Sequence, residues 1–380
     1  MRICHLCLHG PYNEGWSYQE NLLAKYHALS GADVFLIATP YVWDANEIKT
    51  TKDTKYKNKY GVNVIRCQQK KGLSLGGRLE RYPEVMSFLQ EIKPDILFIH
   101  DVQCLDIITV VKYLKHYSNC TVYVDNHSDF FNSARNFLSK TLLHKLLWRN
   151  IARKINPYVK KFYGVLPARV DFLIDVYKLP EDKCELLVMG ADDEEVDRVK
   201  SLNIREKKRK ERGCGDNQIC IVTGGKIDHN KPQIISLMKA VNELADEHIK
   251  LYVFGSVVPE LKTGFLNQTS AFVHYIGWVT PEKIYDEFAF ADLIAFPGLH
   301  SVLWEQAVGM GKPCVFKRIP GFDHIDLGGN CMFFESDSVD EYKRVICEAV
   351  GHIPEMKTVS EKLGIPAFSY KKIAEKSIGE

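Results

Sequence analysis

The residues most able to do chemistry surround Glu305, in the stretch FPGLHSVLWEQAVGMGKPCVF (296–316). A short apolar strand, a Pro-Gly break and a helix starting near Ser301 are expected here. Free N–H groups and the dipole at a helix start attract anions, so a phosphate is expected beside His300 and Ser301. A carboxylate one turn inside that helix repels phosphate but accepts hydrogen bonds from two ribose hydroxyls. The stretch therefore predicts a nucleoside diphosphate site, unless Glu305 only caps its own helix.

Two lysines suit the diphosphate of such a ligand. Lys226 and Lys231 flank a turn in GGKIDHNK (224–231), again between an apolar run and a helical pattern. A departing nucleoside diphosphate gains negative charge, which nearby ammonium groups stabilise. The alternative is that both lysines are solvated loop residues.

A histidine and a glycine in the first half of the chain are further candidates. His127 follows an apolar run in VDNHSDFF (124–131), where it could bind a sugar hydroxyl or act as a base, oriented by Asp125 or Asp129. Gly15, in HGPYNEGWSYQEN (9–21), would let a ligand approach the backbone closely. A purely structural histidine and an ordinary strand-to-helix connection remain the alternatives, and the dinucleotide fingerprint GxGxxG is absent from this turn.

The elements that must position these residues alternate along the whole chain. Apolar strands are expected at 3–9, 33–39, 62–67, 95–100, 121–126 and 162–166, and again at 220–225, 250–255, 272–278, 292–296, 313–317 and 331–336. Helical patterns at 17–31, 84–92, 104–117, 232–245, 281–290, 301–310, 338–350 and 368–380 separate many of them. Such alternation predicts parallel sheets in an α/β protein, with ligands at the carboxyl ends of the strands in a cleft between two domains.

Three segments carry more specific expectations. Ser17 and Glu20 have the spacing of a capping box, which predicts a helix start at that point. The charged segment 191–216 is expected to be a solvated connection. The basic amphipathic segment 136–162 indicates either a domain helix with a solvated basic face or a helix lying on an anionic membrane.

Composition limits the class of protein. The chain has 380 residues, 46% of them hydrophobic, and a net charge of +2, so nucleic acid is not an expected partner. Its 11 cysteines are dispersed, and Cys4 and Cys7 lie in an expected core strand, which favours buried thiols in a reducing cytosol. The start of the chain does not resemble a secretory signal. A cytoplasmic protein is expected, with peripheral contact at the inner membrane face as a further option.

Together these motifs resemble the GT-B glycosyltransferases, and most of all the family 4 retaining enzymes. The resemblance covers nearly the whole chain, and its best parts are GWSYQENLLAKYHALSGADV, GGKIDHNK, YIGWVTPEKIYDEFAFADLIAFPG and HSVLWEQAVGMGKPCVF. It implies two Rossmann-like domains facing each other across a cleft: an acceptor-binding domain at 1–190, a nucleotide-sugar-binding domain at 191–365, and a last helix, 366–380, that returns to the first domain.

The resemblance also implies roles for individual residues. Glu305 would bind the donor ribose, Lys226 and Lys231 the diphosphate, and Gly15 would lie near the phosphate. His127 would lie beside the transferred sugar, and Ile276, Gly277 and Trp278 near the base. The family carries a glutamate eight positions before the ribose acid, where this chain has Pro297, and Arg is commoner than Lys at position 226.

The sequence thus predicts a hexosyltransferase-type enzyme (EC 2.4) that moves a sugar from a nucleoside diphosphate donor, UDP by preference, to an acceptor hydroxyl. Catalysis would rest on His127, Lys226 and Lys231, without metal or cofactor, and with retention of configuration as the resemblance implies. The acceptor would be a lipid-linked glycan, a glycoprotein or a small molecule, in polysaccharide or glycoconjugate synthesis. The alternatives are a non-hydrolysing UDP-sugar 2-epimerase and a non-catalytic partner subunit.

Overall fold

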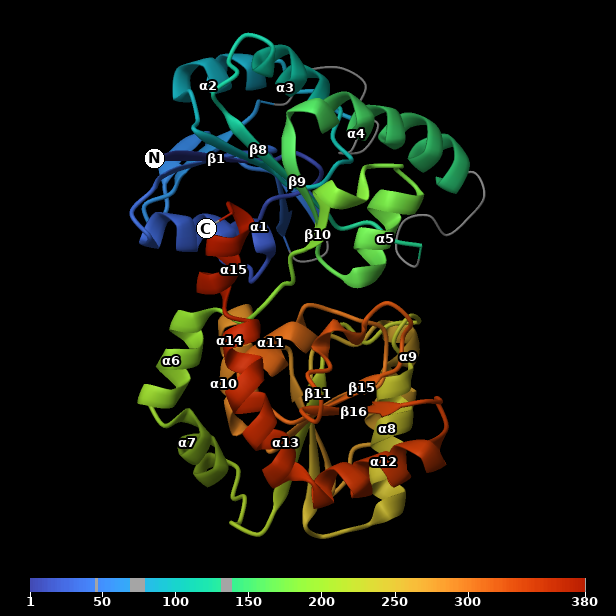
Figure 1. Cartoon of the computed structure of the whole chain (residues 1–380). Coiled ribbons are helices and arrows are strands. Elements are labelled where there is room, and N and C mark those ends of the chain that lie inside the picture. Colours follow the sequence, from blue (N-terminus) through green and yellow to red (C-terminus); the bar gives the residue numbers. More distant parts are fainter. Residues whose placement is uncertain (45–46, 69–78, 131–138, 380) are drawn as a thin grey trace. The chain divides into compact units, whose positions relative to one another are not determined.

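The computed structural model describes residues 1–44, 47–68, 79–130 and 139–379. The chain divides into two compact units: unit 1 is Met1–Val188 with Ile373–Glu380, and unit 2 is Met189–Lys372. Each unit is a layered α/β structure with its own buried apolar core (Figure 1).

Unit 1 contains an eight-stranded sheet in the order β10-β9-β8-β7-β1-β2-β6-β5. Neighbouring strands are parallel, except that β5 runs antiparallel to β6. Strands β1, β7 and β8 are buried on both faces, as expected for parallel strands covered by helices. The strands are β1 (Arg2–Cys7), β2 (Asp33–Ala38), β5 (Lys55–Lys57), β6 (Asn63–Arg66), β7 (Ile96–Ile99), β8 (Thr121–Asn126), β9 (Val159–Gly164) and β10 (Cys184–Leu186), with a separate hairpin of β3 (Tyr41–Asp44) and β4 (Glu47–Thr50).

The helices of unit 1 alternate with its strands, as expected for an α/β unit, although α5 was not predicted. They are α1 (Gln19–Leu29), α2 (Val85–Ile92), α3 (Ile107–Leu114), the π-helical η1 (Ser139–Trp148), α4 (Arg149–Ile155), α5 (Pro167–Asp175) and, from Ile373 onward, α15 (Tyr370–Ser377). The expected capping box is wrong. Tyr18 occupies the N-cap of α1 in an extended conformation without a side-chain capping bond, so the helix starts too late for Ser17 to cap it.

Unit 2 contains six parallel strands in the order β13-β12-β11-β14-β15-β16. This is the doubly wound order in which the direction of winding reverses between the first and fourth strands, here β11 and β14, and ligands bind outside their carboxyl ends. The strands are β11 (Ile219–Gly224), β12 (Ile249–Phe254), β13 (Val273–Gly277), β14 (Leu293–Phe296), β15 (Cys314–Lys317) and β16 (Cys331–Phe334). Each lies where the sequence predicted a strand.

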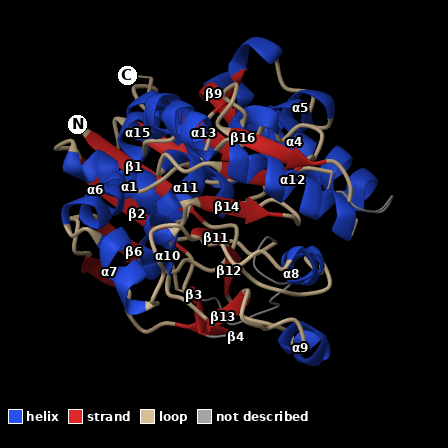
Figure 2. Cartoon of the chain, turned by 90° about the horizontal axis from the view of Figure 1, so that it is seen from below, coloured by secondary structure: helices blue, strands red, loops and turns tan. Residues whose placement is uncertain are grey.

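Helices cover both faces of this sheet (Figures 1 and 2). One side carries α8 and α12, which pack on each other, and the other carries α10 with α6 and α7 outside it. The helices are α6 (Asp193–Ser201), α7 (Ile204–Glu211), α8 (Gln233–Leu244), α9 (Pro259–Leu266), α10 (Pro281–Phe290), α11 (Leu303–Gly309), α12 (Val339–Gly351), α13 (Ile353–Val359) and α14 (Ile365–Ala367).

The charged segment at the start of unit 2 is not the solvated connection that was expected. It forms α6 and α7, whose basic side chains pair with acids on the buried face of α10. Arg198 lies 2.6 Å from Asp286, and Lys208 and Arg212 each lie 2.7 Å from Glu287. Both acids are almost fully buried, and a buried carboxylate is tolerated only with a charged partner. The charges therefore attach these helices to the core.

Two further expectations concern the cysteines and the membrane. Cys4 and Cys7 are buried free thiols in β1, as predicted. Among the described residues, none of the helices combines the length and the apolar character that a bilayer crossing requires.

Candidate functional site

The loops after β11 and β14 meet at the reversal point of the unit 2 sheet. The two strands are paired, so both loops leave from the same carboxyl edge. A Cβ added to Gly298, in the second loop, would lie 3.5 Å from the Cβ and Cγ atoms of Lys231, in the first. The structure therefore brings Lys231 against the turn that leads into α11.

Glycines permit a close approach of backbones at this edge. Gly225 and Gly255 both have φ of +119°, a conformation that other residues rarely adopt. A Cβ on Gly255 would lie only 1.8 Å from the carbonyl oxygen of Gly225, and the Gly225 N–H donates to Phe254 at 3.1 Å. The loops after β11 and β12 are thus held in direct contact.

The two predicted lysines differ in their surroundings. Lys226 is exposed, whereas Lys231 is partly buried. Burial lowers the pKa of Lys231, although Asp228 in the same turn acts in the opposite direction. An ammonium group desolvated in this way is stabilised by an anion, which makes Lys231 the better placed of the two for a diphosphate.

Glu305 is fully buried, at the third position of α11. Its Oε1 atom accepts hydrogen bonds from His300 Nε2 at 2.7 Å and His324 Nε2 at 2.9 Å. Burial alone would raise the pKa of this carboxyl, but the two histidines outweigh it and hold the pKa well below its usual value. The helix begins at Leu303, so His300 and Ser301 precede it, and the His300 ring is engaged with Glu305.

His324 was not among the predicted site residues. It lies in a short turn, Asp323–Ile325 (η4), in the loop between β15 and β16, and its side chain is almost fully buried. No local motif marks it; the available signal is a histidine in a loop that follows a predicted strand. His300, Glu305 and His324 place ligand atoms within 4.8 Å of one another, a donor set that could hold a metal ion. Both imidazoles point at one carboxylate oxygen at hydrogen-bond distance, which a hydrogen-bonded cluster explains without an ion.

Several buried polar atoms around these loops have no hydrogen-bond partner among the described residues. They are Thr223 Oγ1, Gln233 Oε1, Trp304 Nε1, Glu305 Oε2 and His324 Nδ1. Native proteins rarely leave buried polar atoms unpaired, so water or a polar ligand is the expected partner of these atoms. Among these atoms, Glu305 Oε2 is the one that carries charge.

Gly277 and Trp278 end β13 on the same carboxyl edge. Gly277 has φ of +77°, and its carbonyl oxygen accepts the N–H of Gly255 at 2.8 Å. The side chain of Trp278 is 67% exposed, which is unusual for an indole and makes it available for stacking.

In unit 1, His127 lies just past β8 and contacts Asp125. Its Nε2 atom is 3.3 Å from Asp125 Oδ1, and Asp125 Oδ2 is 2.9 Å from His100 Nδ1. Burial alone would lower the pKa of His127, but the Asp125 carboxylate outweighs it and raises the pKa above its usual value. Asp129, the other predicted orienting acid, forms an ion pair with Arg169 at 3.0 Å. Asp125 is therefore placed to orient the ring.

The loop after β1 carries the remaining predicted residue. Gly15 is exposed and has φ of +81°. In the same stretch of sequence, both side-chain polar atoms of buried Gln19 and the Nδ1 atom of His9 lack partners among the described residues. A second group of orphaned polar atoms thus lies at the carboxyl edge of the unit 1 sheet.

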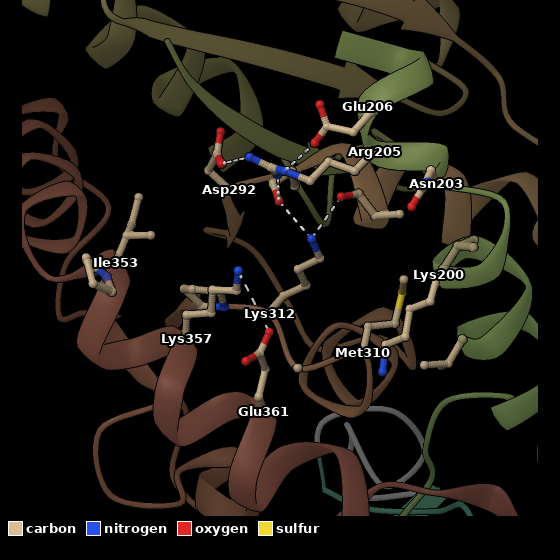
Figure 3. A pocket seen from close by; sticks show the side chains of 17 residues that line it. Lys200, Asn203, Arg205, Glu206, Asp292, Met310, Lys312, Ile353, Lys357 and Glu361 are labelled. Atoms are coloured by element: carbon tan, nitrogen blue, oxygen red, sulfur yellow. Dashed lines mark hydrogen bonds and ion pairs between the residues drawn. The ribbon is translucent and has the colours of Figure 1, made fainter. Parts of the chain in front are cut away.

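A pocket of about 590 Å³ lies at the opposite edge of the unit 2 sheet, where β14 and β15 begin (Figure 3). Lys312 donates to the carbonyl oxygens of Ala289 and Ala291 at 2.9 Å, and Arg205 pairs with Asp292. Burial lowers the pKa of Lys312 to about 7. Lys312 and Arg205 satisfy carbonyl groups at the C-terminal end of α10, and the pocket lies apart from the predicted site.

No family model and no curated protein matches this chain, but many solved structures share its fold. A sucrose-phosphate synthase from Thermosynechococcus elongatus has a TM-score of 0.69 at 14% identity and covers 99% of this chain and 97% of its own. The Anabaena protein HepE, in complex with UDP, has a TM-score of 0.68 at 16% identity, covering 99% and 98%. The UDP-GlcNAc 2-epimerase from Neisseria meningitidis has a TM-score of 0.62 at 10% identity, covering 99% and 98%.

These similarities extend over the whole chain and confirm the predicted fold class. The chain has the GT-B fold, which is built from two Rossmann-like units.

Proposed function

We propose that this GT-B chain is a glycosyltransferase that moves a sugar from a UDP donor to an acceptor hydroxyl. The observation that carries the proposal is the set of groups on one carboxyl edge of the unit 2 sheet: the desolvated cation Lys231, the buried acid Glu305 and the exposed indole of Trp278. An amine, an acid and an aromatic plane match the diphosphate, ribose and base of one nucleotide.

Each part of the donor would contact a different group. Glu305 Oε2, which lacks a partner among the described residues, would accept hydrogen bonds from the two ribose hydroxyls. Lys231 and the more exposed Lys226 would neutralise the diphosphate, most strongly as it departs. Trp278 would lie against the base, with the backbone of Gly277 beside it. His300 and Ser301 would complete the donor site, His300 by holding Glu305 Oε1.

The family resemblance implies roles for two further residues, His127 and Gly15. His127, oriented by Asp125, would bind a sugar hydroxyl, and the positive φ of Gly15 would let the donor approach that backbone. The two lysines would take the place of a metal ion at the diphosphate. Retention of configuration follows from the family resemblance and is part of the proposal, with the acceptor attacking on the face from which the diphosphate leaves.

We infer that the acceptor is a lipid-linked glycan or a glycoprotein, reached from the cytoplasm. On η1, Leu143 and Leu146 are 42% and 53% exposed beside Lys145, while Leu147 and Trp148 pack into the core. Exposed leucines among lysines support peripheral contact with an anionic membrane over a fully solvated basic face.

The test is donor binding followed by turnover. Thermal unfolding of the full chain is measured with UDP, GDP and ADP, and then with the sugar derivatives of the nucleotide that stabilises it. UDP is expected to raise Tm by the largest amount, because a ligand that binds only the native state stabilises it. The best UDP-sugar should release UDP faster when a lipid-linked or protein acceptor is present. No stabilisation by any nucleotide would overturn the proposal and would favour the non-catalytic subunit.

The second candidate is a non-hydrolysing UDP-sugar 2-epimerase, favoured by the similarity to the Neisseria enzyme. It would convert UDP-GlcNAc to its C2 epimer without any acceptor and without net UDP release. Nuclear magnetic resonance of UDP-GlcNAc incubated with the chain separates the two: a new anomeric signal with no free UDP identifies the epimerase.

A further inference from the structure

Three buried histidines in unit 1 form a continuous hydrogen-bonded series. His27 lies on α1, His5 on β1 and His100 just after β7, and each is at most 1% exposed. His27 Nδ1 is 3.0 Å from His5 Nε2, and His5 Nδ1 is 3.0 Å from His100 Nε2. We call His27, His5 and His100 the histidine chain.

Both ends of the histidine chain meet acceptors. At one end, His27 Nε2 lies 3.0 Å from the carbonyl oxygen of Ala374, in the last turn of α15, which lies beside α1 (Figure 1). At the other end, His100 Nδ1 lies 2.9 Å from Asp125 Oδ2. The other oxygen of Asp125 faces His127. The histidine chain therefore links the C-terminal helix to the predicted catalytic histidine.

A count of protons fixes the charge of the histidine chain. The Ala374 carbonyl and an ionised Asp125 can only accept, so the nitrogen at each end must carry a proton. Each of the two contacts between rings needs one proton as well. These contacts together require four N–H protons, whereas three neutral imidazoles supply only three. The histidine chain thus holds one extra proton, or else Asp125 does.

The surroundings place that proton on the ring nearest to Asp125. The Asp125 carboxylate also accepts the backbone N–H of Asp101 at 2.7 Å and faces His127, an environment that favours its ionised form. Burial lowers the pKa of His5, and it lowers the pKa of His27 to about 4, so those two rings stay neutral. The positive charge then belongs on His100, 2.9 Å from the carboxylate.

We propose that the histidine chain holds a proton as a buried His100 imidazolium, which neutralises Asp125 and thereby limits how readily His127 is protonated. His5, His27 and His100 are positioning residues in this view, and the inference rests on the proposed function only for the catalytic role of His127. A neutral histidine chain would leave the full charge of Asp125 to His127, which would then bind its proton more tightly.

The charged groups around His127 have to be considered together. Asp125 and Asp101 raise its pKa, whereas burial and Arg169 lower it, and the His9 ring is stacked at 6.3 Å. Among these groups, only the effect of Asp125 depends directly on the state of His100. A change in the histidine chain should therefore reach His127 through Asp125.

One competing arrangement leaves the histidine chain neutral. The Ser377 hydroxyl lies 3.1 Å from His27 Nε2 and could donate to it. Both contacts between rings would then reverse, His100 would still donate to Asp125, and three protons would suffice. The carbonyl oxygen of Ala374 would then face the lone pair of His27 Nε2 at 3.0 Å. It would also lose the hydrogen bond that the Ser377 hydroxyl donates to it at 2.7 Å. A carbonyl at the C-terminal end of a helix favours a donor, which supports the charged arrangement.

The test is the protonation of each histidine in the full chain, read by long-range proton–nitrogen correlation spectra of histidine-labelled protein. His100 should carry protons on both nitrogens at neutral pH. His27→Phe removes the acceptor for His5, so the histidine chain should become neutral, and the titration midpoint of His127 should rise by roughly one pH unit. His27→Gln keeps both a donor and an acceptor at this position and should leave the titration midpoint of His127 unchanged. His144→Gln, at a buried histidine whose Nδ1 lies 3.0 Å from the Tyr177 hydroxyl, is the matched control.

A neutral His100 in the wild-type chain would overturn the inference, as would an unchanged His127 midpoint in folded His27→Phe. If His27→Phe does not fold, Ser377→Ala decides between the two arrangements. The charged arrangement predicts an unchanged titration midpoint of His127 in this variant, and the neutral arrangement predicts a shifted midpoint. These spectra need no substrate, so a chain that transfers no sugar could still confirm the inference, and an active enzyme could still refute it.

Discussion

Replacing Glu305 by Gln separates the two roles that the structure gives this residue. His300 and His324 both donate to Oε1, so the amide oxygen of the new side chain should take that place and its NH₂ group should take the place of Oε2. The shape is kept, while the buried charge and the second acceptor are lost. The same change should therefore affect stability and nucleotide binding by separate amounts.

Stability should fall modestly in this variant. The hydrogen bonds to the histidines lose the part of their strength that depends on charge, about 1–2 kcal/mol in total. For a unit of this size that corresponds to a fall in Tm of roughly 2–8 °C. Glu211→Gln, at an exposed position on α7 of the same unit, is the matched control and should leave Tm unchanged.

Nucleotide binding should fall much more. Two ribose hydroxyls would lose an ionised acceptor and face an amide donor, at a cost of about 1.5–3 kcal/mol, or roughly 10- to 150-fold in Kd. Calorimetric titration of UDP into the wild-type, Glu305→Gln and Glu211→Gln chains measures this directly. If Glu305→Gln melts earlier but binds UDP as tightly as the wild type, the acid is purely structural and its ribose role is refuted.

Four further changes test separate parts of the account. Lys231→Met should weaken UDP roughly tenfold or more but leave uridine unaffected, because only the diphosphate loses its cation, whereas exposed Lys262→Met should change neither. Trp278→Ala should weaken UDP by roughly 5- to 150-fold, the usual worth of one stacked base, with Tm unchanged because the indole is 67% exposed; an unaltered Kd would exclude stacking. Gly255→Ala should lower the free energy of unfolding of unit 2 by about 3 kcal/mol or more, because the new Cβ would overlap the Gly225 carbonyl. Gly264→Ala, which has open space around it, should not lower this free energy, and chemical denaturation measures both. The pKa of Glu305 is lowered in the folded state, so its contribution to stability is present above about pH 4.3 and is lost as the pH falls. Between about pH 5 and pH 3, the melting temperature of Glu305→Gln should therefore fall less than that of the wild type. Equal falls in both chains would contradict this.

Much of the fold could be predicted because the central strands of both sheets are apolar on both faces. Apolar runs such as DVFLIA and LIAF predict buried parallel strands, and the helices between them show an apolar stripe. The prediction failed for segments that are attached to the core by ion pairs instead of apolar contacts. The charged helices α6 and α7 look solvated in sequence, and only the acids of α10, some 80 residues later, reveal why they pack.

The candidate site was predictable where it depends on strand ends. Lys231 and Glu305 each follow an apolar run, and the strand order then places both loops side by side. His324 was missed because its contact with Glu305 depends on how the loop after β15 folds back, which no local pattern encodes. The histidine chain was missed for a similar reason, since His5, His27 and His100 stand on separate elements and meet only through the pairing of β1 with β7 and the packing of α1.

The most direct test of the account is a crystal structure of the chain grown with UDP. The ribose hydroxyls should lie within hydrogen-bond distance of Glu305 Oε2, the diphosphate at Lys231 and the base against Trp278. UDP bound elsewhere on the chain, with Glu305 still enclosed by His300 and His324 and without a ligand contact, would contradict it.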